Sequence, residues 1–170
     1  VEEKRPGEYL PIIEDDRGAY ILNSKDLSMI EHIQDLINAG LDSFKIEGRM
    51  KSSYYVASIV KAYRQELDLY FYDPENYSPN PQNIEEIKKV SHRPYTTGFY
   101  FGKPTEKDYQ YDNSKYIRDY DFVGMVLDYN SEESMALVEQ RNNFKLGETV
   151  EIMRPDGDNF YYTIENMYDE

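Results

Sequence analysis

The feature that most constrains the fold is a change in hydrophobic period near the middle of the chain. Between Leu27 and Tyr70 apolar residues recur at the three- to four-residue spacing of amphipathic helices. From Phe122 onward they alternate with polar residues, as they do in half-buried strands. Residues 73–81, between the two patterns, hold three prolines together with asparagine and serine, a composition typical of a linker. The sequence therefore predicts two structural units with different secondary structure.

The first unit, residues 1–72, shows the order strand, helix, strand, helix. Short apolar runs at residues 19–22 and 41–46 predict the strands, and the helices are expected over residues 25–39 and 53–70. This order is the signature of parallel α/β units with right-handed crossovers. Two such units leave both edges of the sheet open, so we expect further strands to lie upstream.

Both predicted helices have an identifiable start. Ser24 and Ser52 are candidate N-caps, because a serine hydroxyl accepts a hydrogen bond from the first helical turn. The second helix keeps its apolar spacing over four turns, as a core-facing stripe does, and this stripe comprises Val56, Ile59, Val60, Tyr63, Leu67 and Tyr70.

The second unit, residues 91–170, follows a linker at residues 73–90. The linker includes a short helix, predicted at residues 84–90 with Asn83 as its cap. A short strand is expected at residues 97–101. Four antiparallel strands are expected where hydrophobicity alternates and turn residues intervene, namely at residues 122–129, 134–139, 148–153 and 159–164.

The charge of the chain limits its partners. With 19 basic and 33 acidic side chains, the 170 residues carry a net charge of −14, which repels phosphate backbones over most of the surface. Coating of nucleic acid is therefore excluded, whereas a local basic patch is not. No cysteine is present, so these residues offer no disulfide, no thiolate nucleophile and no cysteine ligand for zinc or an iron–sulfur cluster.

Targeting and catalytic motifs are scarce in this chain. No apolar run approaches the roughly 18 residues that span a bilayer, and the first residues lack the apolar stretch of a signal peptide. We therefore expect a cytoplasmic protein without a membrane partner. His32 and His92 lack a second ligand at metal-binding spacing, so no metal site is predicted. No Gly-x-Ser-x-Gly motif occurs, and the catalytic residues stay unassigned.

A local excess of positive charge points to a binding site. Residues 42–64 carry five basic side chains and two acidic ones, a net charge of +3. In parallel α/β folds the C-terminal ends of strands face the binding crevice, and the N-terminus of the next helix favours anions. Lys25 and Asp26 lie at the equivalent point of the preceding strand–helix pair. We therefore predict a substrate-binding group made of Lys25, Asp26, Lys45, Glu47, Arg49 and Lys51.

Each half of this group also has a structural interpretation. Glu47 can pair with Arg49 or Lys45 merely to close the end of the sheet. Polar residues just before a helix are ordinary capping groups, and an aspartate such as Asp26 in a first turn complements the helix dipole. The sequence leaves both interpretations open.

These residues also make the chain similar to a known family. Residues 1–68, with the segments EEKRPGEY, NSKDL, DSFKIEGRMKS and YYVASIVKAYR, resemble the part of peptidase family U32, the collagenase-like proteins, that follows the family's cysteine region. The segments RPYTTGFYFG, FVGMVLDY and FKLGETVEIMRP resemble its C-terminal part. The resemblance covers nearly all of the chain, and the combination of KIEGR with NSKDL is specific.

The resemblance implies an α/β plus all-β fold, in which the terminal βαβα portion of a TIM-like barrel precedes a small antiparallel β-barrel or partial barrel, similar to the second domain of elongation factors. Members of the family were named as proteases, yet several are similar to proteins that hydroxylate tRNA or rRNA with prephenate and an iron–sulfur cluster. The cysteines that hold this cluster would lie before Val1. The chain is thus expected to be the C-terminal fragment of a prephenate-dependent tRNA (uridine) hydroxylation enzyme, inactive by itself.

The sequence is also compatible with other functions and partners. The alternatives are a collagenase-like peptidase, or its substrate-binding module, and a non-catalytic protein-interaction domain. Expected partners are the remainder of the same polypeptide and tRNA, which would bind through the local basic patch. The sequence is also compatible with a homo-oligomer.

Overall fold

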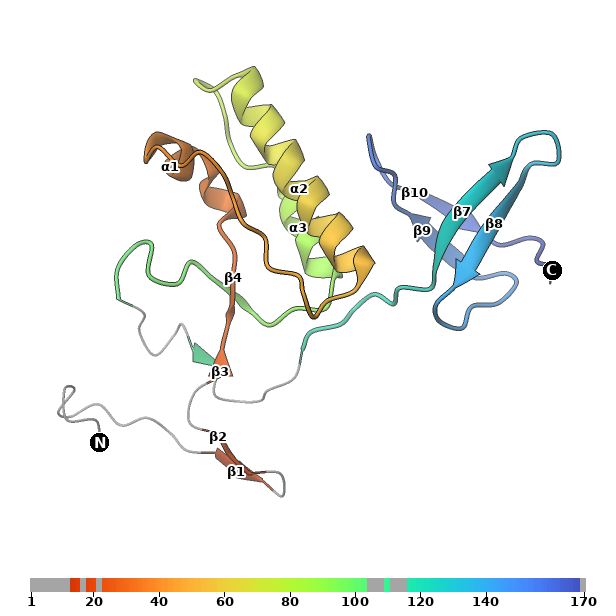
Figure 1. Cartoon of the computed structure of the whole chain (residues 1–170), viewed down its shortest axis with the longest axis horizontal. Coiled ribbons are helices and arrows are strands. Elements are labelled where there is room, and N and C mark those ends of the chain that lie inside the picture. Colours follow the sequence, from red (N-terminus) through yellow and green to blue (C-terminus); the bar gives the residue numbers. More distant parts are fainter. Residues whose placement is uncertain (1–12, 16–17, 21–22, 104–108, 111–115, 169–170) are drawn as a thin grey trace.

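The computed structural model describes residues 13–15, 18–20, 23–103, 109–110 and 116–168. A helical unit occupies the middle of the chain, and two C-terminal β-hairpins lie on one side of it (Figure 1). Near the N-terminus two antiparallel pairs form, each of two or three residues per strand. They are β1 (Ile13–Asp15) with β2 (Gly18–Tyr20), and β3 (Asn23–Ser24) with β6 (Tyr109–Gln110).

The long helix α2 (Ser53–Tyr72) confirms the helix expected over residues 53–70. It begins at the predicted cap, where Ser52 Oγ accepts a hydrogen bond from the Tyr55 amide at 3.2 Å. This bond satisfies one of the N–H groups that the first turn leaves free. The predicted stripe is only partly covered, because Ile59 and Tyr70 are buried whereas Val56 and Val60 remain 39% and 47% exposed.

Helix α3 (Pro81–Lys89) begins three residues before the predicted short helix. Its cap is Asn80 rather than Asn83, because Asn80 Oδ1 accepts a hydrogen bond from the Gln82 amide at 2.9 Å. Pro81 occupies the first turn, where a missing N–H costs nothing and a fixed φ is already helical.

The core of the helical unit lies between these helices and the segment that precedes the first helix. It is formed by buried residues from three parts of the chain, namely Ile30, Ile59, Ala62, Ile87 and Val90. Burial of large aliphatic side chains, each worth about 1.5–3 kcal/mol, therefore holds α3 and the start of the first helix against α2.

The helix expected over residues 25–39 is shorter than predicted. A 3₁₀ turn, η1 (Ile30–His32), leads into α1 (Ile33–Asn38), whereas β4 (Asp26–Leu27) pairs in parallel with β5 (Tyr95–Thr96). Asp26 is held there by Arg93, whose Nε and backbone N–H donate to the two carboxylate oxygens at 3.0 Å each. This contact between residues 67 apart overrides the local capping signal, so Ser24 lies in a strand and caps no helix.

The segment expected as a strand at residues 41–46 is not paired. No backbone hydrogen bond joins residues 42–46 to another residue that the structure describes, so the strand prediction was wrong for this part of the chain. The segment nevertheless keeps the alternation of a strand. Phe44, Ile46 and Gly48 are half-buried, whereas the intervening residues are exposed. Ile46 packs against the core cluster and Gly48 lies against the side chains of Tyr55 and Val56, so these two residues face the helix without strand pairing.

The four C-terminal strands are confirmed to within two residues at each end. They form two antiparallel hairpins (Figure 1), β7 (Gly124–Asn130) with β8 (Met135–Gln140) and β9 (Thr149–Ile152) with β10 (Phe160–Thr163). The strand expected at residues 97–101 was wrong, because this segment is a turn whose Gly98 adopts a φ of 58°, which is the left-handed region that glycine favours.

The C-terminal hairpins bury little of their apolar surface. Among residues 116–168 only Ile164 is buried. The strands of the described residues form five two-stranded sheets, none of which is closed into a barrel. The TIM-like barrel and the small β-barrel implied by the resemblance therefore stay predictions.

Candidate functional site

Three of the predicted site residues are exposed within one short segment. Lys45, Glu47 and Arg49 are exposed and alternate with the half-buried Phe44, Ile46 and Gly48, and Ile46 packs against the helical core. In an extended segment alternate side chains point to opposite sides. Lys45 and Glu47 therefore lie on one side of the segment, and Arg49 is exposed in the turn that follows it. We call these three exposed residues the open face.

A tight turn at residues 48–51 connects the open face to helix α2. The Lys51 amide donates to the Gly48 carbonyl at 2.9 Å, and the Arg49 amide donates to Glu47 Oε1 at 3.2 Å. A Cβ placed on Gly48 would lie 2.8 Å from Val56 Cγ2, a separation that real Cβ atoms do not show. Glycine at this position lets the turn approach the first turn of the helix.

The ion-pair interpretation of Glu47 is not what the structure shows. Its carboxylate accepts a hydrogen bond from the backbone of Arg49 and not from the guanidinium. Neither Arg49 nor Lys45 forms an ion pair with any residue in the described ranges. Both cationic side chains are thus available to a ligand.

Lys51 is turned away from the open face. Its Nζ donates to the Ser91 carbonyl at 3.0 Å and lies 4.2 Å from the ring centroid of Tyr116 and 4.9 Å from that of Tyr55. Each ring attracts the ammonium through its quadrupole. The Lys51 side chain is therefore held by contacts within the chain and points away from Arg49.

Asp26 joins the cluster around Lys51 rather than the open face. It binds Arg93, and the guanidinium carbon of Arg93 lies 5.6 Å from the same Tyr116 ring that Lys51 contacts. Lys25, the residue before β4, is half-buried. The predicted group is thus split into an exposed part, the open face, and a half-buried part that includes Asp26 and Lys51.

Tyrosine hydroxyls surround this half-buried part and remain neutral. Burial, and then the negative charge of Asp26, raise the pKa of Tyr55. Burial likewise raises the pKa of Tyr95, with smaller contributions from Tyr55 and Asp26. At neutral pH these phenols act as hydrogen-bond donors and acceptors without charge. These two tyrosines therefore add no charge to the half-buried part of the group.

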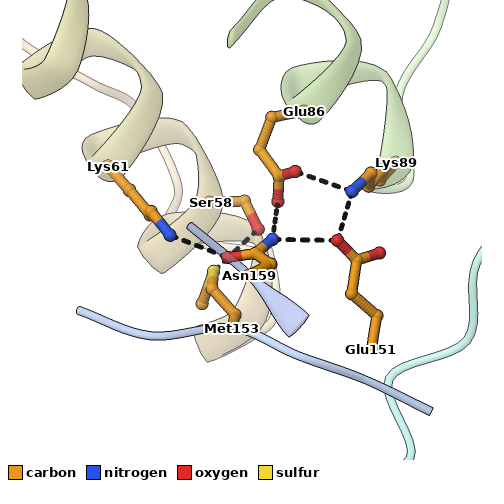
Figure 2. Close-up of polar contacts among 7 residues, drawn as sticks. All are labelled: Ser58, Lys61, Glu86, Lys89, Glu151, Met153 and Asn159. Atoms are coloured by element: carbon orange, nitrogen blue, oxygen red, sulfur yellow. Dashed lines mark hydrogen bonds and ion pairs between the residues drawn. The ribbon is translucent and has the colours of Figure 1, made fainter. Parts of the chain in front are cut away.

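Sequence reasoning missed a polar network between the helical unit and the C-terminal hairpins (Figure 2). Asn159, beside β10, lies at its centre and accepts from Lys61 Nζ at 2.7 Å while donating to Glu151 at 3.0 Å and to Glu86 at 3.3 Å. Lys89 pairs with both glutamates. Lys61 and Asn159 are 98 positions apart in the sequence. The basic segment drew attention to Lys61, but no pattern in a single sequence predicts its contact with Asn159.

The environment of this network shifts two pKa values in opposite directions. Burial alone would raise the pKa of Glu151, but hydrogen bonds from Lys89 and Asn159 lower it below its ordinary value. Burial alone would lower the pKa of Lys89, but its contacts with Glu151 and Glu86 raise it. Both charged forms are thus favoured, and the network joins the two units through opposite charges.

The residues present do not fit an iron–sulfur cluster. The chain has no cysteine, and the described residues contain no group of three histidine, aspartate or glutamate side chains that could hold a metal ion. We therefore assign no step to a cluster within this chain.

None of the helices in the described part of the chain is both long enough and apolar enough to cross a membrane.

Two family models match the chain. The model of peptidase family U32 matches residues 1–110, and the model of the peptidase family U32 C-terminal domain matches residues 118–170. The boundary between the matches falls where the chain leaves the helical unit for the C-terminal hairpins. No solved structure matches the chain.

Several relatives align with most of the chain. tRNA hydroxylation protein P1 of Bacillus subtilis is 42% identical over 151 residues, which are 89% of this chain and 36% of that protein. tRNA hydroxylation protein P of Escherichia coli is 39% identical over 98% of this chain and 36% of its own length. A collagenase of Porphyromonas gingivalis is 28% identical over 83% of this chain and 39% of its own length. The chain thus spans little more than a third of these relatives.

Proposed function

We propose, from the premise that this chain belongs to peptidase family U32, that it forms part of a cytoplasmic tRNA-hydroxylating protein and contributes the open face to its substrate site. The names of two relatives that align with most of the chain support the reaction class. The alternation at residues 44–49 supports the site. This alternation is the observation that carries the proposal, because it places Lys45 and Glu47 on one exposed side, and Arg49 is exposed in the turn directly after them.

A barrel would turn the open face toward a ligand. In an α/β barrel each strand buries one side against helices and turns the other inward, and the active site lies at the C-terminal ends of the strands. Phe44 and Ile46 lie on the more buried side of the extended segment, so Lys45 and Glu47 would face the interior, and Arg49 would lie in the turn at the C-terminal end of the strand. We therefore propose that the chain supplies the terminal βαβα portion of such a barrel.

Two exposed features are suited to the rest of that barrel. Residues 42–46 make no backbone hydrogen bond to another residue that the structure describes, so their N–H and C=O groups suit a neighbouring strand of the full-length protein. The exposed part of the α2 stripe, which includes Val56 and Val60, needs an apolar cover. We propose that other segments of the same polypeptide provide both, and that the C-terminal hairpins belong to a small β-barrel.

The open face suits an anionic group. Arg49 presents a planar fork that meets a carboxylate or phosphate with two parallel hydrogen bonds, whereas Lys45 adds a mobile point charge. Glu47 orients the turn through the Arg49 amide. A phosphate of tRNA and a carboxylate of a prephenate-like donor both have the required charge.

The redox part of the reaction would be supplied from outside this chain. An iron–sulfur cluster needs thiolate ligands, and this chain has none. We therefore propose that its cysteines belong to other residues of the full-length protein. The chain's own contribution is to bind and orient the substrate.

The proposal is tested by replacing Arg49 in the full-length protein. Arg49→Lys and Arg49→Ala should both reduce hydroxylated uridine in tRNA, measured by nucleoside mass spectrometry, because lysine cannot form the bidentate contact. Loss of one charge-assisted contact costs about 1.5–3 kcal/mol, or roughly 10- to 150-fold in affinity. Arg64→Ala is the matched control, since Arg64 pairs with Asp68 on the exposed side of α2.

Two results would contradict the proposal. If Arg49→Ala lowered thermal stability while tRNA hydroxylation stayed normal, Arg49 would have a structural role only. If the protein cleaved gelatin in an Arg49-dependent way and left tRNA unmodified, the collagenase-like function named for one relative would replace the proposed one.

A further inference from the structure

Several segments of the chain meet at the ring of Tyr116. Lys51, at the end of the open-face turn, places its Nζ 4.2 Å from the ring centroid, and Arg93 places its guanidinium carbon 5.6 Å from it. The next residue, Ile117, exchanges backbone hydrogen bonds of 2.7 and 3.2 Å with His92. The backbone next to the ring is therefore held by His92, although 49% of Tyr116 is exposed.

Lys51 links this ring to the turn that carries Arg49. Its backbone amide closes the turn by donating to the Gly48 carbonyl at 2.9 Å. Its side chain is held by the Ser91 carbonyl and by the rings of Tyr55 and Tyr116. The direction in which Arg49 leaves the backbone therefore depends on where Lys51 is held.

The Tyr116 ring also stabilises two cations, Lys51 and Arg93, that lie near it. Lys51 and Arg93 repel each other, and Asp26 forms an ion pair with Arg93. The Lys51 ammonium is attracted by the electron-rich faces of Tyr116 and Tyr55 and by the Ser91 carbonyl. Removing the Tyr116 ring would leave Lys51 with weaker restraint next to a like charge.

We infer that Tyr116 is a positioning residue of the candidate site: its ring holds Lys51, and Lys51 holds the Gly48–Lys51 turn that presents Arg49. The effect on ligand binding rests on the proposed function of Arg49, whereas the effect on the turn does not. A role in packing alone makes a different prediction, because it lowers global stability and leaves the turn and its ligand affinity unchanged in the folded protein.

The inference is tested on the 170-residue chain by amide hydrogen exchange followed by NMR. In Tyr116→Leu the Lys51 amide should exchange about two- to tenfold faster, the range expected for loss of a partly exposed cation–π contact. The amides of Ile59 and Ala62 in the core should be unaffected. Tyr116→Phe keeps the ring and should match the original protein, and Tyr129→Leu, at a 59% exposed position on β7, is the control for a lost surface tyrosine.

A second variant tests the same contact from the other side. Lys51→Met removes the ammonium but keeps the Tyr116 ring, and it should loosen the turn to at least the same degree. Unchanged exchange at residue 51 in both Tyr116→Leu and Lys51→Met would overturn the inference. Equal effects of Tyr116→Phe and Tyr116→Leu would also overturn it, because the hydroxyl and not the ring would then be responsible.

Titration with inorganic phosphate separates the two proposals. If Arg49 binds anions, its NMR signals should shift with phosphate, and Tyr116→Leu should weaken that binding by about two- to tenfold while Tyr116→Phe restores it. Absence of phosphate binding in the original chain, together with a loosened turn in Tyr116→Leu, would contradict the anion site and leave the positioning role intact. Phosphate binding that Tyr116→Leu does not change would contradict the positioning role.

Discussion

Gly48 determines how closely the open-face turn approaches helix α2. A Cβ at this position would lie 2.8 Å from Val56 Cγ2 and 3.7 Å from the Tyr55 ring. The backbone at Gly48 does not have a positive φ, so the requirement for glycine is one of space and not of conformation. The glycine of the KIEGR motif therefore serves the packing that fixes Arg49 and Glu47.

Substituting this glycine should disturb the turn in a way that a second substitution relieves. Gly48→Ala is expected to lower the free energy of unfolding by about 1–3 kcal/mol, the usual cost of overpacking. In a Val56→Ala background the colliding Cγ2 is absent, so the same change should cost less. Urea denaturation of the four proteins gives the coupling. Equal costs of Gly48→Ala in the two backgrounds would show that the collision with Val56 is not the cause.

The pairing of helices α2 and α3 depends on a buried carboxylate. Glu66 is fully buried, and its oxygens accept hydrogen bonds from Tyr77 Oη at 2.7 Å, the Asn80 amide at 3.0 Å and Asn83 Nδ2 at 2.8 Å. All three donors belong to the connection or to the first turn of α3. One acidic side chain thus orders the proline-containing segment that joins the two helices.

Glu66→Gln should weaken this helical pair although it keeps the size of the side chain. The new amide replaces one of the two accepting oxygens by a donor, so Tyr77 Oη, the Asn80 amide or Asn83 Nδ2 loses an acceptor. The expected loss is about 1.5–3 kcal/mol in the free energy of unfolding, measured by urea denaturation. Glu85→Gln is the matched control, because Glu85 forms an exposed pair with Lys88, and such pairs are worth less than about 1 kcal/mol. Equal effects of the two substitutions would refute the role of Glu66.

The elements that the sequence predicted well are those whose signals are local. Helix α2 was predictable from Ser52 and a stripe sustained over four turns, and the C-terminal strands from alternation between turn residues. The start of the first helix was not predictable, because Asp26 is held by Arg93, a residue 67 positions away. Local propensity yields to such tertiary contacts.

The candidate site was predictable only in part for the same reason. Alternation alone places Lys45 and Glu47 on one side of an extended segment, with Arg49 in the turn that follows. The inward turn of Lys51 depends on Ser91 and Tyr116, which no local pattern associates with it. Sequence reasoning therefore identified the correct segment but not which of its cations is free.

The two units of the molecule are joined by charge as well as by packing. Residues 118–170 contain four basic and thirteen acidic side chains, a net charge of −9. Such a unit is repelled by the rest of an acidic chain unless cations lie at the contact. Lys61 and Lys89 lie there and bind Asn159 and Glu151 (Figure 2), while the rings of Tyr54 and Phe122 stack at 5.6 Å.

This joint should give the molecule a characteristic dependence of stability on pH. The pKa of Glu151 is lower in the folded protein than its ordinary value of 4.5, so its stabilising effect is complete above about pH 4.5 and is lost as the pH falls through the folded pKa. The pKa of Lys89 is raised above its ordinary value of 10.5. Its contribution is therefore present below that pH and is lost only as the pH rises toward the folded pKa.

Glu151→Gln should remove the acidic part of this dependence. Because Lys89 and Glu151 are only 17% and 13% exposed in their side chains, we expect the variant to lose about 1.5–3 kcal/mol of unfolding free energy at pH 7, with a smaller difference at pH 3. Urea denaturation at both pH values measures this change. Glu139→Gln is the control, since Glu139 pairs with Arg141 at a more exposed position of the same unit, where a change below about 1 kcal/mol is expected. If Glu151→Gln retained the full difference in stability between pH 7 and pH 3, another carboxylate would be responsible, and the network around Asn159 would join the two units through shape rather than charge.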